Sequence, residues 1–416
     1  MAVSFTSSGT PELYSPVYNP LVFTCSSTNT AQTNFQYLFD LYITGQSGYI
    51  RTKIPADPNA SGRVYYDPSE YLKDYLTKDI NRNDTQIKQN TESYVQYIVK
   101  VGEEYGPNSG VTQYQDLLVD VARYAWNACI DPPTFRRYDE DEWVASYTYT
   151  GKFLTTAPDN IRLYTGKNAW VHMITSGTNV VDYLEIKTYN SSNALIQTVQ
   201  IMNPYTTVGD GDDMFLRCPI GENLNTIAGA QLQLGAQPIL TSAVDHYTVR
   251  GIFDDGFTTG VSIELRTYYI DRTCTGHETF TFHFLNEMGG YDTFTAYRRS
   301  DHEVTIQRKS FKRVTGSITS TTAWDYLNSD RGKINYSTKI GDRITVHSDW
   351  ITEDEAVWLE QLFTSPDVLL DDSTDNFIAV NPLMDSYKRE KQINSDLIKI
   401  TFAFEYGYNR YRQSSI

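Results

Sequence analysis

Apolar and polar residues alternate along several segments of the chain, which is the pattern of a β-strand with one covered face. The clearest case lies near the centre, where Phe280, Phe282 and Phe284 fall on one face. Gly289-Gly290 then supplies a turn, and the chain returns through Phe294. This run predicts a β-hairpin.

Two further segments alternate as cleanly. In residues 36–43 the apolar face holds Tyr37, Phe39, Leu41 and Ile43, whereas Gln36 and Asp40 lie on the other face. In the last strand the apolar face holds Ile398, Ile400, Phe402, Phe404 and Tyr406, opposite Lys399, Thr401 and Glu405. Additional strands are expected at residues 21–25, 94–101, 184–186, 195–201, 263–270, 279–286 and 293–297. The turn Asn190-Ser191-Ser192-Asn193 would join the strands 184–186 and 195–201.

Two helices are predicted from their start signals. Asp67 can cap a short helix that has Pro68 at its first position, Glu70 in the capping box and a buried stripe of Tyr71, Leu72, Tyr75 and Leu76. A second capping box at Thr352-Glu353-Asp354-Glu355 precedes the apolar face Trp358, Leu359, Leu362 and Phe363, and Ser365-Pro366 ends that helix. Residues 114–129 have helical spacing but lie among strands, so both types stay open.

These elements predict a mainly β fold, with tandem β-sandwich domains of Ig-like or jelly-roll-like type and a few short helices. We expect an N-terminal sandwich with a helical insertion at 1–140, a middle sandwich at 141–243, and a C-terminal β-rich domain at 244–416. The last domain would carry the amphipathic helix near 352–364. The turn-rich residues 1–19 suggest a hypothesis, an arm that orders on a neighbouring subunit.

Charge and composition narrow the classes of function. The net charge of −16 disfavours direct nucleic-acid binding, which needs a surplus of Lys and Arg. No apolar run approaches the about 18 residues of a membrane span, and the polar start does not look like a signal peptide, so we expect a chain made in the cytoplasm. Tyrosine is enriched, with 32 residues, which suits wet sheet faces and also assembly surfaces.

Few residues suggest metal or redox chemistry. Cys25, Cys129, Cys218 and Cys274 lie far apart, so we expect reduced thiols in or near cores. His277 and His283 would lie about 20 Å apart on an extended strand, so solvent-facing imidazoles are favoured over a metal site, even with Cys274 nearby. Asp210-Gly211-Asp212-Asp213 resembles part of a calcium loop, but an acidic solvated turn fits it better.

Catalytic motifs are missing from the sequence. We find no nucleophile elbow, no Cys–His signature and no phosphate-binding glycine loop. A glycosidase needs two carboxylates at a set distance, and 51 acidic residues make such pairs too common to be informative. We therefore predict no catalytic residue, no cofactor site and no metal site.

Four segments together resemble a class of viral structural proteins. They are Asn19-Pro20-Leu21-Val22-Phe23 with Phe35-Gln36-Tyr37-Leu38-Phe39-Asp40, Ile54-Pro55 to Gly62 and Tyr66-Asp67-Pro68-Ser69; then Gly151-Lys152-Phe153-Leu154-Thr155 with Ala157-Pro158; then Phe284-Leu285-Asn286-Glu287-Met288-Gly289-Gly290-Tyr291-Asp292; then Trp358-Leu359-Glu360-Gln361-Leu362-Phe363-Thr364-Ser365-Pro366 with the strand after Asn394. In this order they resemble structural proteins, associated with the tail or baseplate, of tailed bacteriophages and prophages of Bacteroidota hosts.

The resemblance implies a virion component located in the tail region, and no enzyme. The expected partners are other copies of the chain in a ring and neighbouring phage tail or connector proteins. Alternatives are a head-proximal tail adaptor and a module that binds host surface glycan, for which residues 147–243 are the expected location. A shallow aromatic patch there would favour glycan binding, whereas a cleft with paired carboxylates would favour a glycan-cleaving enzyme.

Overall fold

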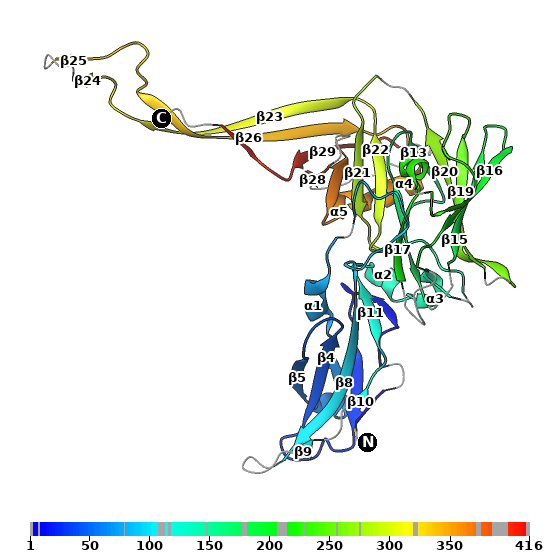
Figure 1. Cartoon of the computed structure of the whole chain (residues 1–416). Helices are drawn as coiled ribbons and strands as arrows, with labels where there is room; N and C mark the ends of the chain where they lie inside the picture. The colour runs from blue at the N-terminus through cyan, green and yellow to red at the C-terminus, as the bar shows by residue number, and fades with distance from the viewer. Residues whose placement is uncertain are drawn as a thin grey trace. The chain divides into compact units, whose positions relative to one another are not determined.

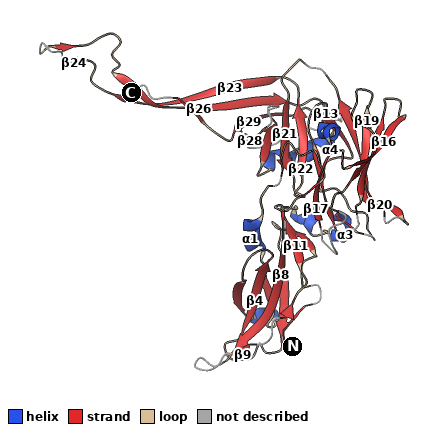
Figure 2. Ribbon diagram, viewed as in Figure 1, coloured by secondary structure: helices blue, strands red, loops and turns tan. Residues whose placement is uncertain are grey.

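Strands supply most of the ordered elements in the computed structural model, and its helices are short, as Figure 2 shows. The mainly β fold class predicted from the sequence is confirmed. The structure describes residues 3–6, 9–78, 80–106, 113–114, 118–146, 149–176, 181–205, 214–227, 229–254, 257–273, 276–318, 323–371, 376–384 and 398–412. The chain forms two compact units: unit 1 contains Met1–Arg272 and Leu285–Thr293, and unit 2 contains Thr273–Phe284 and Phe294–Ile416. The domain boundaries near residues 140 and 243 stay predictions.

The first part of unit 1 is a sandwich of two sheets around one core (Figure 1). The smaller sheet has the order β1 (Val3–Phe5), β3 (Phe23–Ser27), β6 (Val64–Tyr66). The larger has the order β2 (Tyr14–Pro16), β11 (Arg123–Trp126), β8 (Tyr94–Tyr105), β4 (Gln36–Ile43), β5 (Ile50–Pro55), with β9 (Gln113–Tyr114) and β10 (Leu118–Val119) also paired to β8. Phe23 from the first sheet and Tyr37, Phe39 and Tyr97 from the second are fully buried in the shared core.

Two more sheets complete unit 1. One has the order β12 (Val144–Ala145), β14 (Trp170–Thr175), β17 (Met214–Pro219), β7 (Lys88–Gln89). The other, called here the middle sheet, has the order β13 (Asn160–Tyr164), β20 (Thr259–Asp271), β19 (His246–Asp254), β15 (Tyr183–Tyr189), β16 (Leu195–Met202), β18 (Leu232–Leu234). The short helices of unit 1 are η1 (Pro58–Ala60), α1 (Ser69–Leu72), η2 (Lys73–Tyr75), α2 (Pro132–Phe135), α3 (Glu140–Trp143) and η3 (Glu222–Thr226).

Unit 2 is built on one sheet of eight strands. Its order is β22 (Tyr291–Ala296), β21 (Phe280–Leu285), β27 (Val368–Asp371), β28 (Phe377–Pro382), β29 (Thr401–Tyr406), β26 (Lys333–His347), β23 (Ser300–Lys312), with β30 (Arg410–Arg412) also paired to β26. The ring of Phe282 on β21 lies 5.3 Å from that of Phe402 on β29, although two strands separate β21 from β29 in the sheet, so the sheet curls around its own core. The helices α4 (Glu353–Trp358) and α5 (Glu360–Thr364) and the small pair β24 (Ser317–Ile318) and β25 (Trp324–Asp325) complete the unit.

Several predictions hold at the level of single elements. The central hairpin forms as β21 and β22, and Gly289 in its turn has a φ of 82°. The hairpin β15–β16 and the strand β29 lie where they were expected, and the capping box of Thr352 and Glu355 is present at α4. The open segment 114–129 is resolved as strand wherever the structure describes an ordered element in it.

Other predictions are wrong, because alternation and spacing do not show what covers an element. Asp40 was placed on the polar face of its strand, but it is fully buried and pairs with Arg51 at 2.7 Å. Tyr71 and Tyr75 were expected in a buried stripe and are instead exposed, since α1 spans only four residues. The helix near 352–364 is divided into α4 and α5.

The described residues of the N-terminal segment are not a free arm. β1 pairs with β3, and β2 pairs in parallel with β11. Tyr14 and Val17 are almost fully buried. The hypothesis that this segment orders on a neighbouring subunit is therefore wrong for these residues, which are already part of the sandwich.

Candidate interaction surface

The most unusual element of the protein is the long two-stranded ribbon formed by β23 and β26, which extends beyond the other strands of unit 2 in Figure 1. The strands pair antiparallel from Ser300 opposite Val346 to Lys312 opposite Lys333. Thirteen paired residues span about 44 Å at about 3.4 Å per residue. From Asp301 to Lys312 every residue of β23 is exposed, on both faces of the ribbon.

The base of the ribbon is anchored by β29, whereas its outer part has only the short strand β30 beside it. Near the base, β26 pairs with β29 from Arg343 to His347, and Ile344 and Val346 are buried there. Further out, the short strand β30 pairs with β26 at residues 338–340. A two-stranded hairpin is marginally stable in water unless something covers one of its faces. The exposed ribbon is therefore a surface that suits a partner.

One face of the outer ribbon is basic. Residues that lie opposite each other on paired strands share a face, and alternate residues along a strand do so too. Arg308 lies opposite Thr338, which lies opposite Arg412, while Lys312 lies opposite Lys333. These four cations therefore point to the same side, and among the described residues no carboxylate forms an ion pair with any of them.

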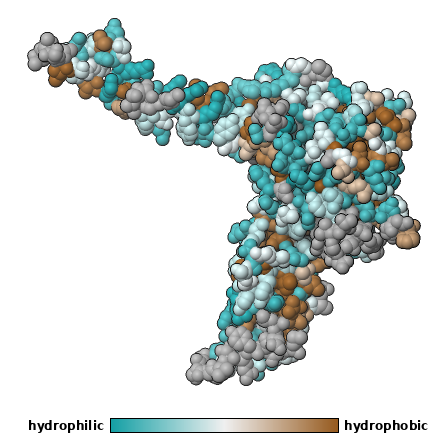
Figure 3. Space-filling model, viewed as in Figure 1, coloured by the Kyte–Doolittle hydropathy of each residue, from teal (hydrophilic) through white to brown (hydrophobic). Residues whose placement is uncertain are grey.

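The other face and the outer end carry apolar groups. The rings of Phe311 and Tyr336 lie 6.2 Å apart beside the buried Ile334, at a register shift between Lys309 and Ser310. Figure 3 shows brown apolar and teal polar areas side by side along the ribbon. The exposed apolar side chains near its outer end are Val314, Ile318, Trp324, Tyr326 and Leu327.

A second candidate surface is a row of aromatic rings on the middle sheet. Tyr189 on β15 stacks on His246 of β19 at 5.1 Å, and His246 lies 5.1 Å from the ring of Tyr269 on β20. The three residues are direct cross-strand neighbours. Tyr269 is 39% exposed, and the exposed Arg162 lies opposite it on β13. This aromatic row is shallow and partly open, although two of its residues lie beyond the segment 147–243 where such a patch was expected.

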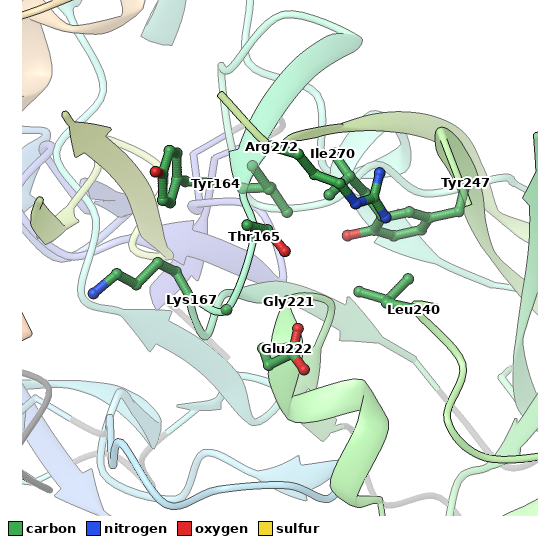
Figure 4. A pocket seen from close by; sticks show the side chains of 11 residues that line it. Tyr164, Thr165, Lys167, Gly221, Glu222, Leu240, Tyr247, Ile270 and Arg272 are labelled. Atoms are coloured by element: carbon green, nitrogen blue, oxygen red, sulfur yellow. The ribbon is translucent and has the colours of Figure 1, made fainter. Parts of the chain in front are cut away.

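A small pocket lies at one end of the same sheet (Figure 4). Its cavity volume is about 20 Å³, and it is lined by Leu163, Tyr164, Thr165, Gly166, Lys167, Gly221, Glu222, Leu240, Tyr247, Ile270 and Arg272. The hydroxyl of Tyr247 donates to the carbonyl of Ile220, and burial holds the pKa of this phenol well above its usual value. The Arg272 guanidinium donates to the carbonyl of Thr241 at 2.8 Å. Both groups thus serve the fold.

The hairpin tip, residues 285–293, forms a buried polar cluster inside unit 1. Asn286 donates to the carbonyl of Leu154 at 2.9 Å and accepts from the backbone N–H groups of Met288 and Gly290. The indole of Trp126 donates to the carbonyl of Met288 at 2.9 Å. These bonds leave little freedom in the tip, so its role is structural.

His172 lies beneath this tip and is almost fully buried. Its Nδ1 accepts from the backbone N–H of Tyr291 at 3.2 Å. Burial, with a smaller effect of the neighbouring Arg217 cation, lowers the pKa of His172 to about 3. The imidazole is therefore neutral in the folded protein at ordinary pH.

The residues considered for metal binding do not come together. His277 is exposed as expected, but the prediction of a solvent-facing imidazole is wrong for His283, which is fully buried 5.1 Å from the ring of Phe377. Covered faces on both sides of β21 explain this. Cys274 and the acidic turn at 210–213 lie outside the described residues. Within the described parts of the chain, no group of three His, Cys, Asp or Glu side chains could hold a metal ion.

The described cysteines are not activated nucleophiles. Cys25 and Cys218 are buried as predicted, whereas the same prediction is wrong for Cys129, which is exposed. Burial raises the pKa of Cys25 to about 12 and also raises the pKa of Cys218. The pKa of Cys129 is raised as well, by partial burial and by the Asp131 carboxylate. Thiolate chemistry needs the opposite shift.

The sequence matches no protein-family model, and no curated protein is significantly similar to it. In the part of the chain that the structure describes, no helix is long and apolar enough to cross a membrane. The ribbon at residues 300–347 was not predicted from the sequence. A signal was nevertheless present, because seven Lys and Arg and only two Asp fall in residues 306–340 of an acidic chain.

Proposed function

We propose that the chain is a structural component of a tailed-phage virion, a subunit of a tail, baseplate or collar ring that acts by self-assembly and protein–protein contacts. The observation that carries this proposal is the β23–β26 ribbon, in which β23 is exposed on both of its faces from Asp301 to Lys312 in the single chain. A hairpin of this length gains stability when a partner covers it. The ordered resemblance to phage tail proteins supports the same function, as does the mainly β architecture with several sheets.

In a ring of identical subunits, the exposed ribbon of one subunit could contact the next subunit. In a head-to-tail ring each subunit presents one surface to the next subunit and receives a different one. The exposed ribbon would serve as one of these two surfaces, and a different surface of the chain would serve as the other. A head-proximal tail adaptor that forms a ring would use the ribbon in the same way and is the alternative position for this subunit.

The test is the copy number of the chain in purified particles, measured by quantitative mass spectrometry, together with the mass of the recombinant chain alone. The proposal expects a fixed copy number per particle, set by the ring. A chain that is absent from particles would overturn it.

Binding to host glycan is a second candidate, favoured by the aromatic row Tyr189, His246 and Tyr269. Sugar rings stack on partly exposed aromatic faces, and the nearby Arg162 and Asp245 could hydrogen-bond hydroxyl groups. Binding of glycans from the host surface to wild-type protein, lost in Tyr269→Ala but kept in Tyr408→Ala, would support this function. Tyr408 is the control because it is also an exposed tyrosine but belongs to unit 2, whereas the aromatic row belongs to unit 1.

A further inference from the structure

The outer ribbon differs in charge from the rest of the chain. Residues 306–340 contain seven Lys and Arg and two Asp, a net charge of +5, whereas the whole chain carries −16. The remaining residues therefore share a charge of −21. Because residues 306–340 are basic and the rest of the chain is acidic, one copy of the chain is electrostatically complementary to another.

The basic residues are arranged for an external partner. One side of the ribbon carries the four cations Arg308, Lys312, Lys333 and Arg412. The residues next to Arg308, Lys312 and Arg412 on their strands are exposed as well. Within the described residues these cations have no carboxylate partner. Arg410, on the same strand as Arg412, shows the contrast, because it is paired bidentately with Asp342 nearer the base. A carboxylate of the chain thus neutralises Arg410, whereas among the described residues none neutralises the four cations of the basic face.

The apolar side chains decide between a protein and a nucleic acid as the partner. A basic two-stranded ribbon can enter the major groove of DNA. Phosphate contacts, however, give no reason to expose Phe311, Tyr336, Trp324 and Leu327 on the other face and at the outer end. Aromatic residues beside Arg at the centre of a surface are typical of protein interfaces. Both faces of the ribbon are satisfied together only by a surface that is acidic and partly apolar.

We infer that the outer ribbon, made of residues 306–318 and 323–340 with β30, docks on the acidic remainder of a second copy of the chain, which makes it the head-to-tail contact between subunits. This inference rests on the proposed function and names the contact that builds the assembly. Charge attraction brings the basic face to the neighbouring body, and the apolar residues at the outer end are buried on docking. The contact is heterologous, so it closes into a ring when the rotation per subunit allows it.

The experiment is sedimentation velocity of the full-length recombinant chain over a range of concentrations, at about 0.05 M and about 0.5 M NaCl, where the screening length falls from about 14 Å to about 4 Å. The wild type should self-associate at low salt and dissociate at high salt. The double variant Arg308→Glu/Lys312→Glu should weaken self-association at least about tenfold, since two attractions become repulsions. The double variant Arg136→Glu/Arg137→Glu is the matched control, because it makes the same change of charge at exposed residues of unit 1 and should associate as the wild type does.

Three results would overturn the inference. These are a wild-type chain that stays monomeric at low salt, a ribbon variant that associates as well as the control, and a wild type that binds duplex DNA or phosphatidylserine vesicles through the ribbon without self-association. All variants change exposed residues only, and equal thermal unfolding midpoints would verify that they are folded. A chain found at fixed copy number in particles but unaffected by the ribbon variant would contradict this inference alone, whereas a chain absent from particles would contradict the proposed function.

Discussion

The hairpin tip at residues 285–293 and the β23–β26 ribbon are both parts of antiparallel hairpins, yet their side chains have opposite environments. In the tip, Asn286 and Met288 are buried and the backbone groups around them have partners in unit 1. In the ribbon, the strand from Asp301 to Lys312 is exposed on both faces. Backbone pairing is therefore common to both, and the side chains determine whether a hairpin belongs to the core or is left for a partner.

Removing the side chain of Asn286 should give the largest loss of stability. Asn286→Ala deletes three hydrogen bonds in a buried site and leaves the carbonyl of Leu154 and two backbone N–H groups without partners. We expect the free energy of unfolding to fall by about 3 kcal/mol or more, measured by urea denaturation followed by tryptophan fluorescence. Gln307→Ala on the exposed ribbon should change it by less than about 0.5 kcal/mol. Similar effects of the two substitutions would contradict the contrast between the two hairpins.

Gly290 in the tip and Gly341 in the ribbon show the same difference in packing around the backbone. A Cβ on Gly290 would lie 2.4 Å from the carbonyl oxygen of Leu154, whereas a Cβ on Gly341 in the ribbon would meet nothing within 4 Å. Gly290→Ala should therefore cost about 1–3 kcal/mol through overpacking. Gly341→Ala should be neutral or stabilise by up to about 1 kcal/mol, since Gly weakens a strand. Thermal unfolding of the two variants side by side checks this, and a tolerated alanine at 290 would show that the tip is loosely packed.

The pH dependence of stability reports on burial beneath the tip. His172 has its pKa lowered to about 3 in the folded protein, chiefly by burial, against about 6.5 in an unfolded chain. As the pH falls below about 6.5, the unfolded chain takes up a proton that the folded protein does not, so stability is lost down to about pH 3. Between pH 7.5 and 5.5 this residue should account for a loss of about 1.4 kcal/mol.

Two histidine variants isolate that loss. His172→Gln keeps an acceptor for the Tyr291 N–H and should unfold with a stability that is less dependent on pH by this amount. His302→Gln, at an exposed residue of β23, should retain the wild-type dependence. If His172→Gln lost stability between the two pH values as steeply as the wild type, another group would have to be responsible.

The sequence was informative where one face of an element is covered and the other is wet. The alternation through Phe402 and Phe404 predicted β29, and the capping-box spacing of Thr352 and Glu355 predicted the start of α4. It was misleading where both faces are covered, as at Asp40 and His283, because polar residues on a second buried face look like solvent-facing ones.

The ribbon was not predicted for the complementary reason. β23 has only Val304, Ile306 and Phe311 as large apolar residues, and none of them is buried, so no covered face imposes a pattern.

The aromatic row on the middle sheet was missed for a different reason. Tyr189, His246 and Tyr269 are far apart in the sequence and meet only through the pairing of β15, β19 and β20.

The most direct test of the central claim is to remove the ribbon. Ile306 lies opposite Ile340, so residues 307–339 can be replaced by Asn-Gly, a two-residue turn that suits a hairpin. The account predicts that this shortened chain keeps the thermal unfolding midpoint of the wild type and sediments as a monomer under low-salt conditions in which the wild type associates. A folded, shortened chain that associates as the wild type does would contradict the claim that the ribbon is the assembly surface.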